Sequence, residues 1–197
     1  MRTLDVISDA ICPWCWIGKA HLDAALEQLR QDGLEFRIRW RPFQLNPDMP
    51  AEGVARDAYR AGKFGSLERS RELDAQVADA GRAAGLAFRH DLMTRTPNTI
   101  AAHRVIRAAE DAGVQHAVVD ALFRAYFQAG RDIGDAATLD EIAEAAGLPG
   151  MVAMLAGEDH RDAVLAEDMA ARRGGISGVP SFLIGAAPNS TGQAAQP

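Results

Sequence analysis

The first fifty residues contain two segments with strand-like patterns, and a segment with helical periodicity separates them. Residues 3–8 (TLDVIS) are short and rich in residues that favour strands. Pro13 suits the first position of a helix, and residues 15–30 keep an apolar face at helical spacing. The segment FRIRWRPF (36–43) then alternates strictly, which predicts an edge strand with one solvated face. This opening predicts a strand–helix–strand unit.

A long helical region follows this unit. Residues 53–173 show helical periodicity almost throughout. Asn98 is predicted to be the N-cap of one helix, and Thr138 with Glu141 is predicted to form the capping box of another. The segment 118–127 is apolar on more than one face, so we expect it at the centre of the helical region.

The chain returns to strand-forming residues at GVPSFLIG (178–185). We therefore predict an α/β fold whose α/β unit is interrupted by a large, all-helical insertion. The predicted boundaries are residues 1–50 and 174–185 for the α/β part and residues 51–173 for the insertion. The end of the chain carries no charge and no large apolar side chain, so we expect residues 186–197 to be a disordered tail.

Composition excludes several classes of function. With 48% apolar residues, the chain can bury a core without disulfide staples. A net charge of −6 provides no basic footprint, so neither nucleic acid nor an anionic membrane is an expected partner. No apolar run approaches the roughly 18–20 residues that span a bilayer, and the N-terminal residues do not resemble a secretory signal. We expect a cytoplasmic protein.

The only two cysteines, Cys12 and Cys15, lie in the segment SDAICPWCWIG (8–18). In the cytoplasm such a CxxC pair is usually redox-active or metal-binding. A zinc site needs four ligands, and the sequence offers no further cysteine and no paired histidines at ligand spacing. A structural disulfide across so short a loop would restrict the unfolded chain very little. Reversible dithiol chemistry is the remaining interpretation.

The predicted helix assigns different roles to the two thiols. Cys12 would lie at the N-terminus of the helix that Pro13 opens, where free backbone N–H groups and the helix dipole stabilise a thiolate. Cys12 is therefore the predicted nucleophile, and Cys15, one turn further into the helix, would resolve the mixed disulfide. Pro13 and Trp14 are predicted to shape the exposed lip where a substrate binds.

Five motifs occur in order along the chain: CPWCWIGK after the first strand, KFG (63–65), PNTIAAHR (97–104), LFRAYFQAGRDIGD (122–135) and GISGVPSFLI (175–184). Together they resemble the DsbA-like thioredoxin-fold oxidoreductases. Within these they resemble the FrnE-like branch, which is related to 2-hydroxychromene-2-carboxylate isomerases and kappa-class glutathione transferases. The resemblance implies a thioredoxin-like fold with a helical insertion, and a thiol–disulfide oxidoreductase that acts on protein or small-molecule thiols and disulfides. It implies no bound cofactor or metal, with glutathione as a candidate co-substrate.

The resemblance also implies a cis peptide before Pro180. That peptide would hold the backbone of Val179 beside Cys12, where a substrate could pair with it. One departure from the family is Val6, which stands where related domains often bury an acidic residue. The nearby Asp9 is expected to point elsewhere, so no proton-transfer partner for the second cysteine is assigned.

A second departure is that the chain lacks the strand and helix that family members carry after the cis-proline strand. Residues 180–184 would then form an exposed strand edge, which is a pairing hazard unless something covers it. Either the chain is truncated, or a partner subunit, as in a homodimer, supplies the cover.

Polar side chains outside the CxxC motif are expected to lie on solvated faces, and two other functions compete with the oxidoreductase. His103 is predicted to lie on the solvated face of its helix, and the alternative is a site role near the cysteines. The row Arg37, Arg39 and Arg41 is predicted to be a solvated edge, and the alternative is anion binding. One rival is a glutathione-dependent isomerase or transferase, whose relatives usually place serine where Cys12 stands. The other is a non-catalytic, chaperone-like subunit.

Overall fold

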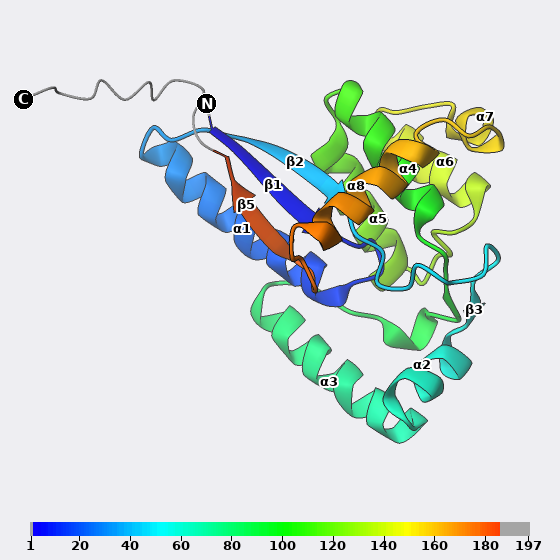
Figure 1. The fold of residues 1–197 in the computed structure, drawn as a ribbon. Helices are drawn as coiled ribbons and strands as arrows, with labels where there is room; N and C mark the ends of the chain where they lie inside the picture. Colours follow the sequence, from blue (N-terminus) through cyan, green and yellow to red (C-terminus); the bar gives the residue numbers. More distant parts are fainter. Residues whose placement is uncertain (1, 186–197) are drawn as a thin grey trace, which may run out of the picture.

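A three-stranded sheet forms the α/β part of the molecule. The computed structural model describes residues 2–185, and the predicted tail lies outside this range. The strands β1 (Arg2–Ser8), β2 (Phe36–Pro42) and β5 (Ser181–Ile184) are arranged in the order β2-β1-β5 (Figure 1). β1 and β2 are parallel, and α1 (Pro13–Gln31) provides the crossover that a parallel pair needs. β5 is antiparallel to β1. The predicted strand–helix–strand unit and returning strand are confirmed.

Helices fill most of the sequence between β2 and β5, as predicted. Two-residue strands β3 and β4 pair with each other, and a short 3₁₀ turn, η1, precedes β4. No helix within residues 2–185 is long and apolar enough to cross a membrane. Figure 1 shows α2 and α3 together below the N-terminal end of α1. The elements are β3 (Val54–Ala55), α2 (Arg56–Phe64), α3 (Leu67–Ala83), η1 (His90–Leu92), β4 (Arg95–Thr96), α4 (Ile100–Asp111), α5 (Gln115–Phe127), α6 (Ala136–Ala145), α7 (Met151–Ala156) and α8 (Arg161–Arg173).

The core joins α1 to the helical region through aromatic side chains. Trp16 of α1 is buried, and its ring stacks on that of Phe127 at a centroid distance of 5.7 Å. The ring of Phe88 meets Trp16 edge-on at 4.8 Å. The inner part of α5, including Leu122 and Phe123, is buried in the same cluster, as the sequence predicts. The helix that carries both cysteines is thus fixed by packing to the helical region.

The outer edge of β2 is protected by a side chain of α5. The amide oxygen of Gln115 accepts the backbone N–H of Trp40 at 2.8 Å, and its amide nitrogen donates to the Trp40 carbonyl at 3.1 Å. Both residues are buried. The glutamine side chain therefore satisfies backbone groups that a missing neighbouring strand would leave unpaired.

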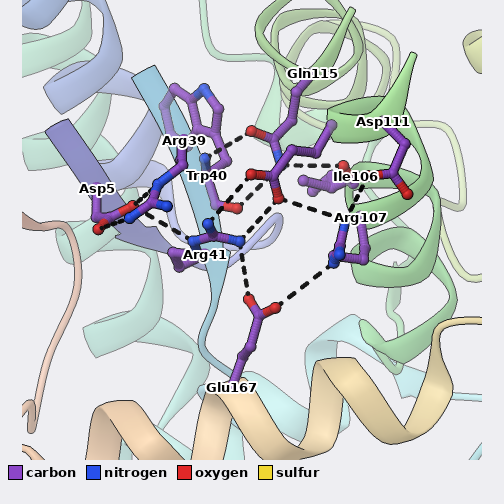
Figure 2. A network of polar contacts seen from close by, with 10 residues as sticks. Asp5, Arg39, Trp40, Arg41, Ile106, Arg107, Asp111, Gln115 and Glu167 are labelled. Atoms are coloured by element: carbon purple, nitrogen blue, oxygen red, sulfur yellow. Dashed lines mark hydrogen bonds and ion pairs between the residues drawn. The ribbon is translucent and has the colours of Figure 1, made fainter. Parts of the chain in front are cut away.

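The predicted solvation of the arginine row on β2 is wrong for two of its three members. Arg37 is exposed, but Arg39 donates two hydrogen bonds of 2.6 Å to Asp5 on β1. Arg41 lies between β1, α4 and α8, and it donates hydrogen bonds to Glu110 of α4 at 2.8 Å and to Glu167 of α8 at 3.4 Å (Figure 2). Arg39 and Arg41 are partly covered because α8 packs against β2. The arginines tie the sheet to two helices.

Two predicted helix caps are in the wrong register. Asn98 is not the N-cap of α4, since the cap position belongs to Thr99; the Asn98 side chain accepts the N–H of Ile100 instead. Thr138 does not begin α6, because the side chain of Asp135 is the N-cap and accepts the Thr138 N–H at 2.8 Å. Both helices exist, and only their first turns differ from the prediction.

β5 exposes a strand edge, as predicted. Within residues 2–185 it pairs only with β1. Three apolar side chains on it are largely exposed: Phe182, Leu183 and Ile184. The homodimer that would cover this edge remains a prediction.

Candidate active site

Cys12 occupies the N-cap of α1. Its backbone is extended, Pro13 follows at the first helical position, and the Cys12 carbonyl accepts the N–H of Cys15 at 3.0 Å. The Cys12 N–H donates to the carbonyl of Asp9 at 3.0 Å, which closes the turn between β1 and α1. The sequence folds this way because proline needs no N–H partner at the start of a helix. The N-cap places the Cys12 sulfur at the positive end of the helix dipole.

Cys15 lies one turn further along α1 and is directed into the core. Both cysteines are free thiols; Cys15 is 1% exposed and Cys12 4%. Burial raises the pKa of the Cys15 thiol well above its ordinary value, and the neighbouring Cys12 adds to the rise. Hydrogen bonds from the Ser8 side chain and the Asp9 backbone oppose this pKa rise without cancelling it. The Cys15 thiol therefore stays protonated near neutral pH.

The loop before β5 brings a distant segment to the dithiol. The peptide between Val179 and Pro180 is cis, as the resemblance implied. The Cys12 thiol donates to the Val179 carbonyl, with the sulfur 3.7 Å from the oxygen. Gly18 of α1 permits this approach, since a Cβ built on it would lie 2.9 Å from Cγ of Pro180. Sequence reasoning assigned no role to this glycine, although it belongs to the CPWCWIGK motif.

A cavity of about 330 Å³ opens beside Cys12. Pro13, Trp14 and Val179 line it together with Cys12, whereas Cys15 does not. Trp14 is 49% exposed at the lip. Most of the other lining residues come from α2, α3, η1 and α5, so the helical region encloses much of the space in front of the first cysteine. The structure thus places most of the predicted substrate-binding residues around one cavity.

The predicted solvation of His103 is wrong. Its side chain is 2% exposed and its Nε2 lies 3.1 Å from Oδ1 of Asp9, whose side chain is fully buried. The other Asp9 oxygen accepts the backbone N–H of Leu45 at 2.8 Å. The contact between His103 and Asp9 joins α4 to the turn that precedes Cys12. One signal was available: His103 lies three residues before the buried Ile106, at the margin of the apolar stripe of α4.

The position expected for a buried acidic residue is occupied by Val6, which is buried among apolar side chains. Among residues 2–185, no group of three or more histidine, cysteine, aspartate or glutamate side chains is arranged to hold a metal ion. The two free thiols and the cavity beside Cys12 together can support thiol chemistry on a molecule bound in that cavity.

Comparisons with known proteins agree with this geometry. A family model described as a DSBA-like thioredoxin domain matches residues 3–196. The structure of a probable DsbA oxidoreductase from Streptomyces coelicolor superposes with a TM-score of 0.82 at 30% identity, covering 93% of this chain and 80% of that chain. The uncharacterized protein YwbO of Bacillus subtilis (strain 168) is 25% identical over 186 residues, which is 92% of this chain and 86% of YwbO. A cytosolic disulfide reductase, DsbM from Pseudomonas aeruginosa, shares the fold with a TM-score of 0.66 at 22% identity, covering 91% of this chain and 83% of that chain.

Proposed function

Because the chain belongs to the family of DsbA-like thioredoxin domains, we propose that it is a thiol–disulfide oxidoreductase that uses Cys12 and Cys15 as its redox-active pair. The predicted family and fold are confirmed by the match to the family model and by the Streptomyces coelicolor structure. Cys12 is the proposed nucleophile and Cys15 the resolving thiol. Pro13, Trp14, Val179 and Pro180 are proposed to contact the substrate.

The asymmetry between the two thiols is the observation that carries the proposal. The Cys12 sulfur reaches both the cavity and the Val179 carbonyl, so a substrate sulfur can approach it. Cys15 is buried and lies outside the cavity lining, and its pKa is raised by burial. A thiol that is protonated and inaccessible cannot attack an incoming substrate, but it can attack the neighbouring Cys12 once that sulfur is in a mixed disulfide.

In the reducing direction, the Cys12 thiolate attacks a substrate disulfide, forms a mixed disulfide and releases one substrate thiolate. Cys15 then loses its proton and attacks the Cys12 sulfur. This step breaks the mixed disulfide, forms the Cys12–Cys15 disulfide and releases the second substrate thiolate. Two electrons pass from the dithiol to the substrate, and each departing thiolate takes up a proton. The same steps in reverse oxidise a substrate dithiol.

The proposed redox partners are protein thiols or low-molecular-weight thiols and their disulfides, with glutathione as a co-substrate rather than a bound cofactor. We propose a cytoplasmic location, because DsbM from Pseudomonas aeruginosa, which shares the fold, is a cytosolic disulfide reductase. Both cysteines are free thiols in the structure, and the stacked, buried rings of Trp16 and Phe127 pack α1 against the helical region.

The test is equilibration of the purified protein with defined ratios of reduced and oxidised glutathione, followed by alkylation of free thiols and gel electrophoresis. We expect Cys12 and Cys15 to interconvert as one intramolecular pair, with a potential between roughly −120 and −270 mV. Cys15→Ser should accumulate a mixed disulfide with glutathione on Cys12, and Cys12→Ser should not. A folded protein that forms no intramolecular disulfide would refute the mechanism, and isomerase activity that survives replacement of both cysteines would favour the isomerase instead.

A further inference from the structure

The second step of the proposed mechanism needs an acceptor for the Cys15 proton. Cys15 is buried and lies outside the lining of the cavity beside Cys12, so its thiol does not face solvent through that cavity. Val6 stands where related domains often bury an acidic residue, and an apolar side chain cannot take up a proton. Another polar group close to Cys15 has to accept the proton.

Ser8 and Asp9 lie next to the Cys15 sulfur. The Ser8 hydroxyl and the Asp9 backbone are within hydrogen-bond reach of this sulfur. Ser8 is the last residue of β1, and it is buried. A hydroxyl accepts one hydrogen bond while it donates another, so Ser8 can take the Cys15 proton on one side and pass its own proton on at the other.

A second cavity joins Ser8 to His103 of α4. This inner cavity measures about 10 Å³, and both residues line it. A space of this volume holds at most one water molecule. A single water molecule there can bridge the serine hydroxyl and the imidazole, so the polar path that begins at the Cys15 sulfur continues as far as His103.

The Asp9 carboxylate prepares the imidazole to accept a proton. Nε2 of His103 lies 3.1 Å from Oδ1 of Asp9. An ionised carboxylate only accepts hydrogen bonds, so Nε2 carries the hydrogen and Nδ1 is the basic nitrogen. The Asp9 side chain is fully buried, and in such surroundings a carboxylate and an imidazolium attract each other more strongly than in water. A proton taken up by His103 therefore produces an ion pair and no isolated buried charge.

Other titratable groups that face this region do not accept a proton near neutral pH. Arg41 also lines the inner cavity, but it is a cation that donates to a glutamate of α4 at 2.8 Å. Lys19, one turn after Cys15, is a cation paired with two carboxylates at 2.7 and 3.1 Å. Burial raises the pKa of Tyr126 well above its ordinary value and the charge of Asp9 adds to the rise, so the phenol keeps its proton.

We propose that Ser8 and His103 form a proton relay for Cys15, with Asp9 as the residue that positions the imidazole. The inference rests on the proposed dithiol function and assigns the groups that move the Cys15 proton. In the resolving step the Cys15 proton passes to the Ser8 hydroxyl, and the Ser8 proton passes through one water molecule to Nδ1 of His103. The Cys15 sulfur then forms its bond to the Cys12 sulfur, and the substrate thiolate leaves with the electron pair of the broken bond. When the Cys12–Cys15 disulfide is reduced again, His103 returns the proton along the same path.

The experiment follows the two chemical steps separately in the wild type, His103→Gln and Ser8→Ala. Glutamine keeps an N–H group for Asp9 but takes up no proton near neutral pH, and alanine removes the relaying hydroxyl. The reduced protein is mixed with excess bis(2-hydroxyethyl) disulfide, quenched with acid at set times and analysed by mass spectrometry. The mixed disulfide on Cys12 forms at a rate proportional to the probe concentration, whereas its conversion to the Cys12–Cys15 disulfide is independent of that concentration.

At pH 7 we expect each variant to slow the resolving step by roughly 100-fold, the lower end of what a general base contributes, while the mixed disulfide forms within about twofold of the wild-type rate. Between pH 6 and pH 9 the resolving rate of the variants should rise about tenfold per pH unit, because it depends on free Cys15 thiolate. The wild-type rate should level off over the same range. His21→Gln is the matched control: it replaces an exposed histidine of α1 and should leave both rates within about twofold of wild type.

Circular dichroism at 222 nm identifies the variants that fold, and if His103→Gln does not fold, Ser8→Ala decides the question by the same criteria. A resolving rate within twofold of wild type in either folded variant would overturn the relay. Equal slowing of both steps would also overturn it, because that is the result expected of a structural role alone. If the wild type forms neither the mixed disulfide nor the Cys12–Cys15 disulfide, the dithiol function itself is wrong and the relay fails with it.

Discussion

Replacing His103 by leucine should destabilise the protein strongly, because it leaves Asp9 buried with half of its hydrogen bonds. The Asp9 side chain is fully buried, and its two hydrogen-bond contacts, with His103 Nε2 at 3.1 Å and with the Leu45 N–H at 2.8 Å, use one oxygen each. Leucine is chosen because it fills most of the imidazole volume and donates no hydrogen bond. The cavity beside His103 measures only about 10 Å³, room for one water molecule at most, and alanine would enlarge it.

The expected cost is about 3–5 kcal/mol, the usual result of removing one partner from a buried ion pair or charged hydrogen bond. For a domain of this size that corresponds to a fall in Tm of roughly 6–20 °C. Asp9→Asn should cost less than His103→Leu, because a neutral amide is cheaper to bury than a carboxylate. The Asp9→Asn/His103→Leu protein should be more stable than the sum of the two single changes predicts.

The assay is urea unfolding of the reduced proteins at pH 7, followed by circular dichroism at 222 nm. His21→Leu is the matched control, since His21 is exposed on α1, and a change there should stay within about 0.5 kcal/mol. A loss below about 1 kcal/mol for His103→Leu, or strict additivity in the double variant, would refute the view that the pair is energetically coupled.

Two further predictions concern α1. Burial raises the pKa of the Cys15 thiol well above its ordinary value of 9.0. Above about pH 9 the unfolded chain loses the Cys15 proton while the folded protein keeps it, so the free energy of unfolding should fall as the pH rises from about 9 toward the folded-state pKa. Below about pH 9 both states keep the proton, and the stability is unaffected. Urea unfolding of reduced Cys12→Ser between pH 7 and 10 should show this loss, and Cys12→Ser/Cys15→Ser should lack it. Gly18→Ala puts a methyl group 2.9 Å from Cγ of Pro180; we expect a loss of about 1–3 kcal/mol and slower oxidation of the dithiol by bis(2-hydroxyethyl) disulfide. Wild-type stability and rate in that variant would contradict the close packing.

The features that the sequence predicts well are those decided within a few neighbouring residues. The alternation in residues 36–43 predicts a strand and its apolar face, and the proline after Cys12 predicts the start of a helix. The strand–helix–strand unit and the position of Cys12 at the N-cap therefore follow from the local sequence. The cis peptide before Pro180 could not be read from the residues alone; the motif resemblance supplied it. The opposed environments of the two thiols follow from their separation by one helical turn.

The features that the sequence misses depend on contacts between segments far apart in the chain. His103 looks solvated until the turn that carries Asp9, 94 residues earlier, is placed against α4. Arg41 looks solvated until α8 covers β2. The cavity beside Cys12 cannot be predicted from the sequence for the same reason, because α2, α3 and η1 join Cys12 there only in the folded chain.

The dithiol and the cations that line the cavity beside Cys12 come from different elements of the fold, so a substitution in one is expected to leave the other unchanged. The two cysteines belong to the start of α1, and the loop before β5 contacts Cys12. The cations that line the cavity, Arg56, Arg60 and Lys63, all belong to α2, which has no buried residue. The Cys12 sulfur contacts the Val179 carbonyl, and the pKa of Cys15 responds to burial, Cys12, Ser8 and Asp9; within residues 2–185 no hydrogen bond joins a cation of α2 to either sulfur. Lys63→Gln should therefore leave the redox potential of the Cys12–Cys15 pair unchanged when the variant and the wild type are equilibrated with the same glutathione ratios. If this variant shifted the potential, the cations of α2 and the dithiol would form one electrostatic unit, and the separation argued from their positions would be wrong.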